Sequence, residues 1–574
     1  MRKIILAAMA VTAFPVFAAA PVPPAGPAGP TLKELKADSS NTKDVLTYGM
    51  GWGQQRYSKL KQINTDSVKS LVPVWSYSMA DKRAQSTQPL VKDGVMYVTN
   101  HDSTVALDAV TGEQIWKQTF EYDPGVPGTV CCGNHNRGPA IYNGRLYRTT
   151  LDAYIIALDL KTGEEIWRSQ AADWKEGYSM TVAPLVAKGV IITGISGAEY
   201  GIRGFIDGWD AKSGKHLWRK HTTAAPGEEG ADTWLPGRYE QGGASTWLTG
   251  SYDPDLDLVY WGTGNGGPWN AAFRGGDSKH IASVLAFRPK TGDVVWTYQF
   301  SPGDPYDYDG TSEMVHGEMK IKGKNRKVLM QANRNGFMYV LDRKDGELLA
   351  ANPFVDKITW AKGIDLKTGR PIDTEITKQV RASVEMKEPV DIWPSAWGGK
   401  NWSPMSYDPE SKLVFANTLN FGFPYRPIQP KFRKGTFYIG MEWAGFSWPE
   451  NNERGILRAI DPLTGEAKWS TPFEIPNFAG TMNTAGGLVF TGALTGEFMA
   501  FDKKDGKKVW EHQTGSGIVS MPITYSQEGV QYVTIVSGVG GVYPLYSGDE
   551  RMNKVPAGGT VTTYALFDKT YAKR

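Results

Sequence analysis

A short pattern that ends in tryptophan recurs along the chain and constrains the fold more than any other feature of the sequence. A copy starts with a small or apolar residue, carries an aspartate and a glycine in its turn in most cases, and ends in tryptophan ten residues later. The copies are Ala106–Trp116, Ala157–Trp167, Gly208–Trp218, Ala286–Trp296, Ala459–Trp469 and Ala500–Trp510, with Val340–Ala350 as a degenerate copy. The first three tryptophans are 51 residues apart, and a repeat of about fifty residues is typical of a propeller blade.

Each copy predicts a β-hairpin. An apolar strand ends at the aspartate, the glycine supplies a positive φ in the turn, and a second strand carries the tryptophan. One blade alone cannot bury both of its faces, so blades must close into a ring, with the tryptophan packed between neighbours. The composition agrees, because 65 Gly, 20 Trp, 26 Tyr and 21 Phe among 574 residues suit many turns that join short aromatic-rich strands.

The sequence therefore predicts an all-β, eight-bladed β-propeller with tryptophan-docking repeats, and seven blades are the alternative. Seven copies account for seven blades. The interval from Ala350 to Trp469 has room for two blades without the turn signature. In this interval we expect strands at Leu413–Asn417 and Thr436–Met441.

The first residues of the chain have the pattern of an export signal. Arg2 and Lys3 precede the apolar stretch Ile4–Phe17 and the small residues Ala18–Ala20. A membrane anchor is the alternative, but the apolar stretch is shorter than the roughly 20 residues that a span needs. We predict a signal peptide at residues 1–20, a flexible leader at 21–40, and a single propeller domain at 41–574.

Charge and hydropathy exclude two classes of partner. The chain has 63 basic and 60 acidic residues, a net charge of +3, which is too small for its size to indicate a nucleic-acid partner. No stretch after the signal is long and apolar enough to predict a membrane span.

The two cysteines, Cys131 and Cys132, are adjacent in the chain. If they form a disulfide in an exported protein they form it with each other, and two buried reduced thiols are the alternative. Neighbouring Cα atoms lie about 3.8 Å apart, closer than a disulfide usually spans, so this ring would be strained. Strain of this kind is uncommon unless it serves a functional site.

A second candidate site is acidic. Asp307 and Asp309 lie at positions i and i+2 of the loop Ser301–Gly310, and in an extended loop they point to the same side. Such a pair suits a hard cation, and a solvated acidic loop is the alternative. The seven histidines show no metal-ligand spacing and CxxCH is absent, so a zinc site or a covalent haem has no support.

The repeats and motifs together resemble the quinoprotein alcohol dehydrogenases of the methanol/ethanol family, which are periplasmic eight-bladed propellers that carry pyrroloquinoline quinone (PQQ). The resemblance extends from about Leu46 to the last repeat. It implies a periplasmic PQQ- and metal-dependent dehydrogenase that oxidises alcohols to aldehydes or ketones and passes electrons to a soluble cytochrome c. A non-catalytic periplasmic propeller scaffold is the alternative, and homodimerisation is left open.

The resemblance also assigns cofactor contacts. The stretch Cys131–Gly138 is similar to the family's motif in which the disulfide lies on one face of the quinone and an arginine, here Arg137, binds a cofactor carboxylate. Trp247 matches the aromatic residue that stacks on the other face. The remaining implied contacts are Thr181, Ser196, Gly197, Ala198, Arg334 and Asn401.

Catalytic and metal residues follow from the same resemblance. Asp307 matches the catalytic base, and Arg334 the arginine that hydrogen-bonds the reactive quinone oxygens. Glu199, Asn265 and Asp307 match metal ligands. Calcium-dependent members have a small residue where this chain has Asp309, and lanthanide-dependent members have aspartate, whose extra charge offsets that of a trivalent ion. The resemblance therefore favours a lanthanide ion, with Ca²⁺ as the alternative.

Two residues depart from the family pattern. Ser86 stands where the family usually has glutamate near the cofactor, and Phe478 where a tryptophan commonly lies near the pocket. We expect effects on cofactor affinity and substrate shape. The segments Thr359–Ser395 and Phe421–Trp448 carry Trp and Phe that we expect to close over alcohols larger than methanol.

Overall fold

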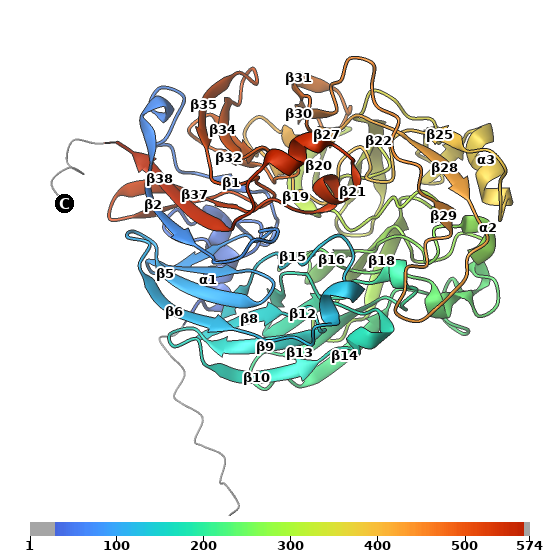
Figure 1. The fold of residues 1–574 in the computed structure, drawn as a ribbon, viewed down its shortest axis with the longest axis horizontal. Helices are drawn as coiled ribbons and strands as arrows, with labels where there is room; N and C mark the ends of the chain where they lie inside the picture. The colour runs from blue at the N-terminus through green and yellow to red at the C-terminus, as the bar shows by residue number, and fades with distance from the viewer. Residues whose placement is uncertain (1–28, 568–574) are drawn as a thin grey trace, which may run out of the picture.

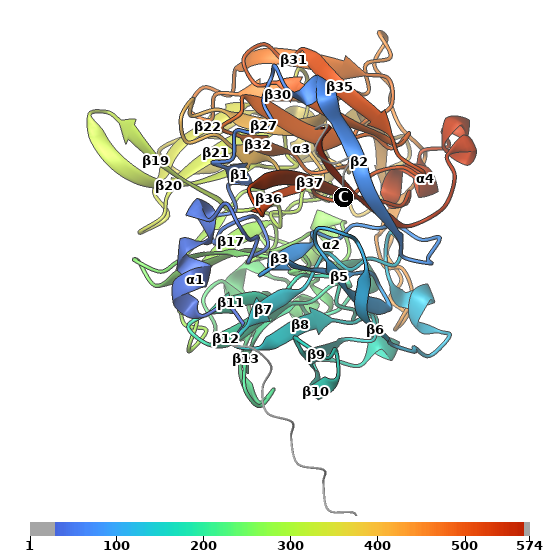
Figure 2. The same cartoon turned by 90° about the vertical axis from the view of Figure 1, so that its left-hand side faces the viewer.

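Antiparallel sheets stand side by side around a ring (Figures 1 and 2). The structure is a computed structural model that describes residues 29–567. The predicted signal peptide and residues 21–28 of the predicted leader lie outside these residues. The all-β prediction is confirmed, since the α-helices of the described residues are four short segments. They are α1 (Leu32–Ala37), α2 (Ala271–Arg274), α3 (Glu375–Ala382) and α4 (Val542–Tyr546).

The main sheets have four antiparallel strands each, and one has a fifth strand that pairs parallel; there are also two smaller sheets among the described residues. Five of the main sheets run in chain order: β3 (Leu90–Lys92), β4 (Val95–Thr99), β5 (Ser103–Asp108), β6 (Gln114–Thr119); β7 (Ala140–Tyr142), β8 (Arg145–Thr149), β9 (Tyr154–Asp159), β10 (Glu165–Gln170); β11 (Leu185–Ala187), β12 (Val190–Gly194), β13 (Phe205–Asp210), β14 (His216–His221); β15 (Ser251–Asp253), β16 (Leu258–Gly262), β17 (Ser283–Phe287), β18 (Val294–Gln299); and β19 (Val315–Ile321), β20 (Lys324–Ala332), β21 (Phe337–Asp342), β22 (Leu348–Pro353). The other main sheets have the strand orders β26 (Ser406–Tyr407), β27 (Val414–Leu419), β30 (Gly455–Ile460), β31 (Ala467–Phe473); β1 (Tyr57–Ser58), β32 (Met482–Thr484), β33 (Leu488–Gly492), β34 (Glu497–Asp502), β35 (Lys508–Gln513); and β2 (Leu71–Ser78), β38 (Thr560–Leu566), β37 (Val530–Ser537), β36 (Ile523–Gln527). The smaller sheets are β23 (Ala361–Asp365) with β24 (Arg370–Asp373), and β25 (Val390–Ile392) with β28 (Phe423–Pro427) and β29 (Met441–Glu442).

Each copy of the repeat forms a hairpin between the last two strands of its sheet. In the first copy, β5 ends at Asp108, whose carboxylate accepts hydrogen bonds from the backbone N–H groups of Val110 and Thr111 at 2.9 and 2.8 Å. Gly112 then takes a φ of +77°, and β6 carries Trp116 back along β5. The aspartate and the glycine of the repeat therefore build the turn, as the sequence predicts.

The tryptophan of one sheet packs on the glycine turn of the next sheet. A Cβ atom at Gly163 would stand 2.5 Å from the ring of Trp116, and the Trp116 indole N–H donates to the carbonyl of Leu160 at 3.3 Å. The same contact recurs in the pairs Trp75–Gly112, Trp167–Gly214, Trp218–Gly292, Trp296–Gly346 and Trp469–Gly506. The predicted packing of the tryptophans between neighbouring blades is therefore confirmed.

The two ends of the described chain meet in one sheet. Strand β2 pairs antiparallel with β38, with Leu71 opposite Leu566. Trp510, from the last repeat, donates to the carbonyl of Leu71 at 3.1 Å. This sheet has no repeat turn because its strands come from both ends of the chain. The main sheet without the repeat turn therefore lies at the ring closure, and not in the interval from Ala350 to Trp469, where the sequence suggested room for it.

The interval from Ala350 to Trp469 instead contains one main sheet and both small sheets. The strand expected at Leu413–Asn417 corresponds to β27, but Thr436–Met441 is not a blade strand. In that segment the backbone N–H of Tyr438 donates to the carbonyl of Glu199 at 2.6 Å. The segment is thus tied to a loop of a distant sheet, which explains why its strand-like sequence does not enter a blade.

Part of the predicted leader is helical. Thr31 and Glu34 form a reciprocal capping box at the start of α1, and Leu35 is buried. The prediction of a flexible leader up to residue 40 is therefore wrong for residues 32–40, which are helical. Although this segment is rich in charged residues, it buries the side chain of Leu35 against the domain. No helix of residues 29–567 is long and apolar enough to cross a membrane.

The docking of tryptophan on glycine predicts the effect of one added methyl group. Gly163→Ala would place a Cβ against Trp116 at a φ of +76°, and we expect the free energy of unfolding to fall by about 3 kcal/mol. Gly323→Ala is the matched control, because Gly323 has a φ of +79° and no atom within 4 Å of the added Cβ. It should cost only about 1 kcal/mol. Equal losses in denaturant unfolding would contradict the packing argument.

Candidate active site

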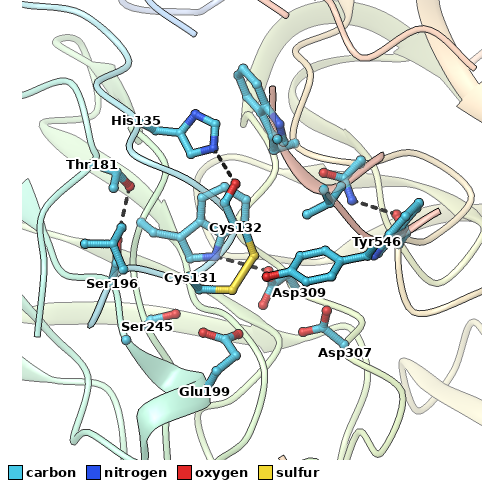
Figure 3. Close-up of a pocket in the computed structure, with 18 of the residues that line it drawn as sticks. Cys131, Cys132, His135, Thr181, Ser196, Glu199, Ser245, Asp307, Asp309 and Tyr546 are labelled. Carbon is cyan, nitrogen blue, oxygen red and sulfur yellow. Dashed lines mark hydrogen bonds between the residues drawn. A yellow bond between two sulfur atoms is a disulfide. The ribbon is translucent and has the colours of Figure 1, made fainter. Parts of the chain in front are cut away.

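A cavity of about 390 Å³ is lined by loops that connect the strands of successive sheets (Figure 3). Most of the residues predicted for the site from sequence line this cavity. They are Cys131, Cys132, Arg137, Thr181, Ser196, Gly197, Glu199, Trp247, Asp307, Asp309, Arg334 and Asn401. The other two, Ala198 and Asn265, do not line it and are buried beside these residues. Positions spread over 270 residues of sequence are thus brought together by the ring.

The cysteine pair lies at one wall of the cavity. Cys131 and Cys132 form a disulfide, so the prediction that they bond to each other is confirmed. Cys132 and Gly133 both have positive φ angles, +70° and +108°, and the turn directs the disulfide towards the cavity (Figure 3). The left-handed conformation at Cys132 is one that few residues other than glycine adopt.

Arg137 is clamped between two indole rings. Its guanidinium carbon lies 4.7 Å from the ring centroid of Trp247 and 4.8 Å from that of Trp402. It donates to the hydroxyl of Thr181 at 2.5 Å, and that hydroxyl lies 3.1 Å from the hydroxyl of Ser196. Burial lowers the pKa of Arg137 to about 10, so the group is still a cation at neutral pH. The clamp fixes a charged donor beside the cavity.

Two carboxylates pair with one guanidinium at the floor of the site. Arg334 forms ion pairs with Asp307 at 2.8 Å and with Asp309 at 2.9 Å, and all three side chains are buried. Trp247 donates its indole N–H to Asp309 at 3.1 Å. The backbone N–H of Asn265 donates to the other Asp309 oxygen at 2.5 Å. Asp309 is therefore a fixed member of the site, and the alternative of a solvated loop acid does not hold for it.

The site carries more negative charge than its arginine balances. Burial raises the pKa of Glu199 to about 7, and the nearby Asp309 carboxylate adds to the rise. Burial also raises the pKa of Asp307 and of Asp309, while Arg334 opposes the rise in both cases. Three carboxylates whose pKa values only one nearby cation, Arg334, lowers cannot all ionise easily in a medium of low dielectric. An added metal ion would favour their ionised forms.

The donor set fits a hard cation. Asp307 Oδ1 and Asn265 Oδ1 are buried and have no hydrogen-bond partner within residues 29–567. Together with Glu199 they offer only oxygen, which is the ligand type that calcium and similar hard cations prefer. The residues predicted as ligands therefore agree with the chemistry of such an ion.

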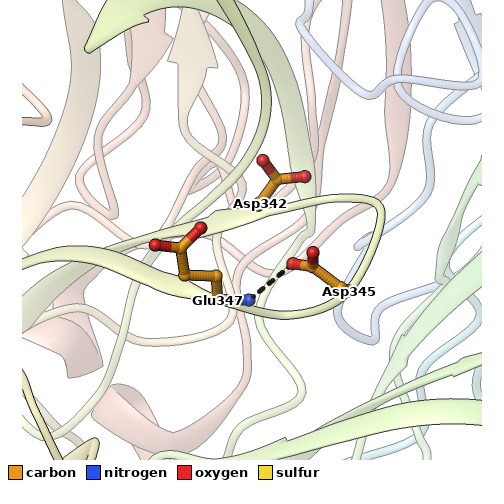
Figure 4. Close-up of side chains that lie close together, drawn as sticks. All are labelled: Asp342, Asp345 and Glu347. Atoms are coloured by element: carbon orange, nitrogen blue, oxygen red, sulfur yellow. Dashed lines mark hydrogen bonds between the residues drawn. The ribbon is translucent and has the colours of Figure 1, made fainter. Parts of the chain in front are cut away.

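A second acidic group lies away from the cavity, at the turn between β21 and β22 (Figure 4). Its members Asp342, Asp345 and Glu347 place carboxylate oxygens within 4.8 Å of one another. Arg326 pairs with Asp342 at 2.8 Å and with Glu347 at 2.9 Å, and Asp342 caps the repeat turn. The group is accounted for by the hairpin and its ion pairs.

The sequence interpretation missed most of the apolar wall. The additional apolar and aromatic lining residues are Val130, Trp269, Trp397, Trp402, Phe437, Ile439, Trp443, Val542 and Tyr546. Trp269 and Trp402 lie close in sequence to Asn265 and Asn401, which the family resemblance assigns to the site. Three more come from the expected segment Phe421–Trp448, whereas none of the lining residues comes from Thr359–Ser395. Val542 and Tyr546 belong to α4 near the chain end and had no sequence signal.

The two departures from the family pattern lie behind the cavity wall. Ser86 is buried, and its hydroxyl lies 3.1 Å from Nδ1 of His135, which lines the cavity. Phe478 is buried, with its ring 6.2 Å from that of Trp397. Both residues therefore touch a lining side chain rather than the cavity itself, so any effect on cofactor or substrate passes through that side chain.

Comparisons with known proteins point to one family. The family model described as "Glucose/ethanol/alcohol dehydrogenase, beta-propeller domain", of the PQQ type, matches residues 46–351 and 451–533. Quinoprotein alcohol dehydrogenase PedH of Pseudomonas putida is 39% identical over 93% of each chain. Quinoprotein ethanol dehydrogenase of Pseudomonas aeruginosa is 38% identical over 95% of this chain and 94% of its own.

Solved structures show the same fold. A europium-containing methanol dehydrogenase superposes with a TM-score of 0.88 at 34% identity, over 93% of this chain and 100% of the other. The quinohemoprotein alcohol dehydrogenase from Comamonas testosteroni superposes with a TM-score of 0.86 at 34% identity, over 93% of this chain and 82% of its own.

The excess charge predicts how stability depends on pH in cation-free protein. The unfolded chain releases the Glu199 proton near its ordinary value of 4.5, whereas the folded chain holds it to about pH 7. The free energy of unfolding should therefore fall as the pH rises from about 4.5 to 7. Glu199→Gln should remove this pH dependence, and its free energy of unfolding at pH 8 should exceed that of wild type by about 3 kcal/mol.

Denaturant unfolding at pH 5 and pH 8, with chelator and then with Ca²⁺ or La³⁺, measures this effect. Asp38→Asn is the control, since burial raises the pKa of Asp38 to about 7 as well, outside the cavity. Added cation should stabilise wild type and Asp38→Asn at pH 8, and Glu199→Gln much less. Equal stabilisation of all three proteins would place the cation elsewhere.

Proposed function

The chain belongs to the PQQ-dependent quinoprotein alcohol dehydrogenases, and from that membership we propose that it is a periplasmic, cation-dependent enzyme that oxidises alcohols to aldehydes or ketones. The observation that carries this proposal is the cavity in which a disulfide, a clamped arginine, the buried carboxylates of Asp307 and Asp309 and the partly buried carboxylate of Glu199 meet. A family match to a propeller alone would not distinguish an enzyme from a scaffold.

PQQ is flat and carries three carboxylates, and the residues present suit both properties. We assign the disulfide Cys131–Cys132 and the Trp247 indole to its two faces. Arg137, held in place by Trp247 and Trp402, is the donor for one cofactor carboxylate. The remaining polar contacts are assigned to Thr181, Ser196, the Gly197–Ala198 backbone, Arg334 and Asn401. The cavity volume of about 390 Å³ is within the usual range for a small-molecule site.

The base in this mechanism is Asp307. Arg334 holds Asp307 Oδ2 by an ion pair and the Asp307 carbonyl by a hydrogen bond at 2.9 Å. Oδ1 has no partner within the described residues, and its two acceptor positions would serve the cation and the hydroxyl proton of the alcohol. When bound, the quinone supplies a carbonyl that accepts hydride from the alcohol, and the cation polarises that carbonyl. The apolar wall excludes water from this step.

The proposed cation is a lanthanide, with Ca²⁺ as the alternative. Its ligands are Glu199, Asn265, Asp307 and Asp309. Asp309 supports the trivalent ion because Glu199 and Asp307 already balance a divalent charge. The europium-containing methanol dehydrogenase among the similar structures is consistent with this assignment.

Electrons must leave the site, and we propose a separate soluble cytochrome c as the acceptor, since the sequence has no CxxCH motif. The location follows from the predicted signal peptide at residues 1–20. We further propose that the main sheets are the eight blades of a single propeller domain within residues 41–574. Homodimerisation is left open.

The alternative is a propeller scaffold without a cofactor. It gives no reason for a buried, charge-rich cavity, because ionised groups are costly to bury without a ligand or partner. An absorbance spectrum of protein purified with added PQQ separates the two functions. A scaffold would show only the protein band.

Reconstitution of metal-free protein with PQQ tests the cation. We expect a light lanthanide to give markedly higher activity than Ca²⁺ with an artificial electron acceptor. Asp309→Ala should lose most of the lanthanide-dependent rate, and Asp307→Asn should lose at least about 100-fold with either ion because the base is gone. Asp345→Ala, in the acidic group outside the cavity, is the control. Calcium activity equal to the lanthanide activity and insensitive to Asp309→Ala would leave a calcium enzyme.

The exposed aromatic residue Trp443 at the cavity predicts a preference for alcohols with a long apolar chain. Trp443 lines the cavity and is 38% exposed, so it can cover the apolar tail of a longer alcohol. In a series of 1-alkanols, Trp443→Ala should lower kcat/KM for octanol by about tenfold, the effect of losing roughly 50 Å² of apolar contact, and leave ethanol nearly unchanged. Phe432→Ala is the control, because Phe432 is also exposed and does not line the cavity. Turnover of methanol alone would refute the prediction.

A further inference from the structure

His135 is a lining residue that neither the repeats nor the proposed chemistry uses. It is buried, and both of its ring nitrogens have partners. Figure 3 shows the contact with Cys132. Nε2 lies 2.8 Å from the carbonyl oxygen of Cys132, and Nδ1 lies 3.1 Å from the hydroxyl of Ser86. Because a carbonyl can only accept, Nε2 carries the proton, and Nδ1 accepts from the serine. The two contacts thus fix the tautomer and the orientation of the ring.

The turn that His135 contacts has little other support. Within residues 29–567, no other hydrogen bond is recorded to a backbone group of the turn from Cys131 to Gly133. Cys132 has a φ of +70°, a conformation that persists only where the surroundings hold it. The residue that follows His135 is firmly anchored, because the Asn136 side-chain amide donates to the carbonyl of Thr149 at 3.0 Å.

We propose that His135 is a positioning residue that ties the disulfide turn to the buried loop before β3, and that Ser86 in this loop fixes the orientation of the imidazole. The consequence for the cofactor rests on the proposed function, since the disulfide is assigned to one face of PQQ. The proposal that His135 holds the turn does not depend on the proposed function. His135 acts through Cys132 and takes no part in proton transfer.

The environment of the ring agrees with this role. Burial, and next the charge of Arg137, lower the pKa of His135 to about 3, so the imidazole stays neutral over the working range of pH. The neutral imidazole can donate a hydrogen bond to the Cys132 carbonyl without adding positive charge beside Arg137. It also gives a physical meaning to the departure at position 86, because a glutamate there would accept from Nδ1 and draw the imidazole towards the charged form.

Two substitutions separate the hydrogen bond from the bulk of the side chain. His135→Leu fills the space and removes the donor, whereas His135→Gln keeps an N–H that can reach the Cys132 carbonyl. His316→Leu is the matched control: His316 is also buried, with Nε2 2.9 Å from the hydroxyl of Ser251, away from the cavity. Circular dichroism first establishes that all variants are folded.

The first measurement is the rate at which dithiothreitol reduces the disulfide of cofactor-free protein, followed by thiol counting. The second is the Kd for PQQ from quenching of tryptophan fluorescence. We expect His135→Leu to raise both values by about tenfold, the effect of one lost hydrogen bond to a buried carbonyl. His135→Gln should lie near wild type. Ser86→Ala should have a smaller effect that disappears in the His135→Leu background.

Wild-type values for His135→Leu in both measurements would overturn the proposal. An equal change in His316→Leu would also overturn it, because the effect would then be a general loosening of the fold. If wild type itself does not bind PQQ, the proposed function fails, and the reduction rates still decide whether His135 holds the turn.

Discussion

The packing of a tryptophan on the glycine turn of the next sheet is the contact on which the rest of the structure depends. Each such contact fixes the distance and rotation between two sheets, since the ring of Trp116 touches Gly163 and its N–H bonds the next turn. Because this contact is repeated around the ring, the loops of successive sheets meet at the cavity. The antiparallel pair of β2 and β38 then closes the ring, so the main sheets from the two ends of the chain also have a neighbour.

The cavity formed in this way concentrates buried charge of one sign. Asp307 and Asp309 share Arg334, and Glu199 has no cation of its own within the described residues. Such an arrangement costs free energy unless a ligand offsets it. The rigid ring provides that free energy, because the loops are held at both ends by strands. The same rigidity allows the disulfide turn at Cys132 to keep a conformation that a free loop would leave.

Much of this could be predicted from the sequence, because the repeat and the site motifs are local signals. The aspartate, glycine and tryptophan of each copy specify the turn and its docking partner without long-range information. The location of the main sheet without the repeat turn could not be predicted in the same way, since its strands β2 and β38 are far apart in the sequence. The segment that contains Tyr438 also has strand-like residues, but its hydrogen bond to Glu199 places it over the site instead. Tyr546 gave no signal at all, as its role depends only on where α4 lies in the ring.

The most direct test is a crystal structure of the protein with PQQ and a lanthanide, with anomalous diffraction used to locate the ion. The account predicts one strong anomalous peak within ligand distance of Glu199, Asp307 and Asp309, and a planar ring between the disulfide and Trp247. A peak at another acidic group, or PQQ density outside the cavity, would contradict it.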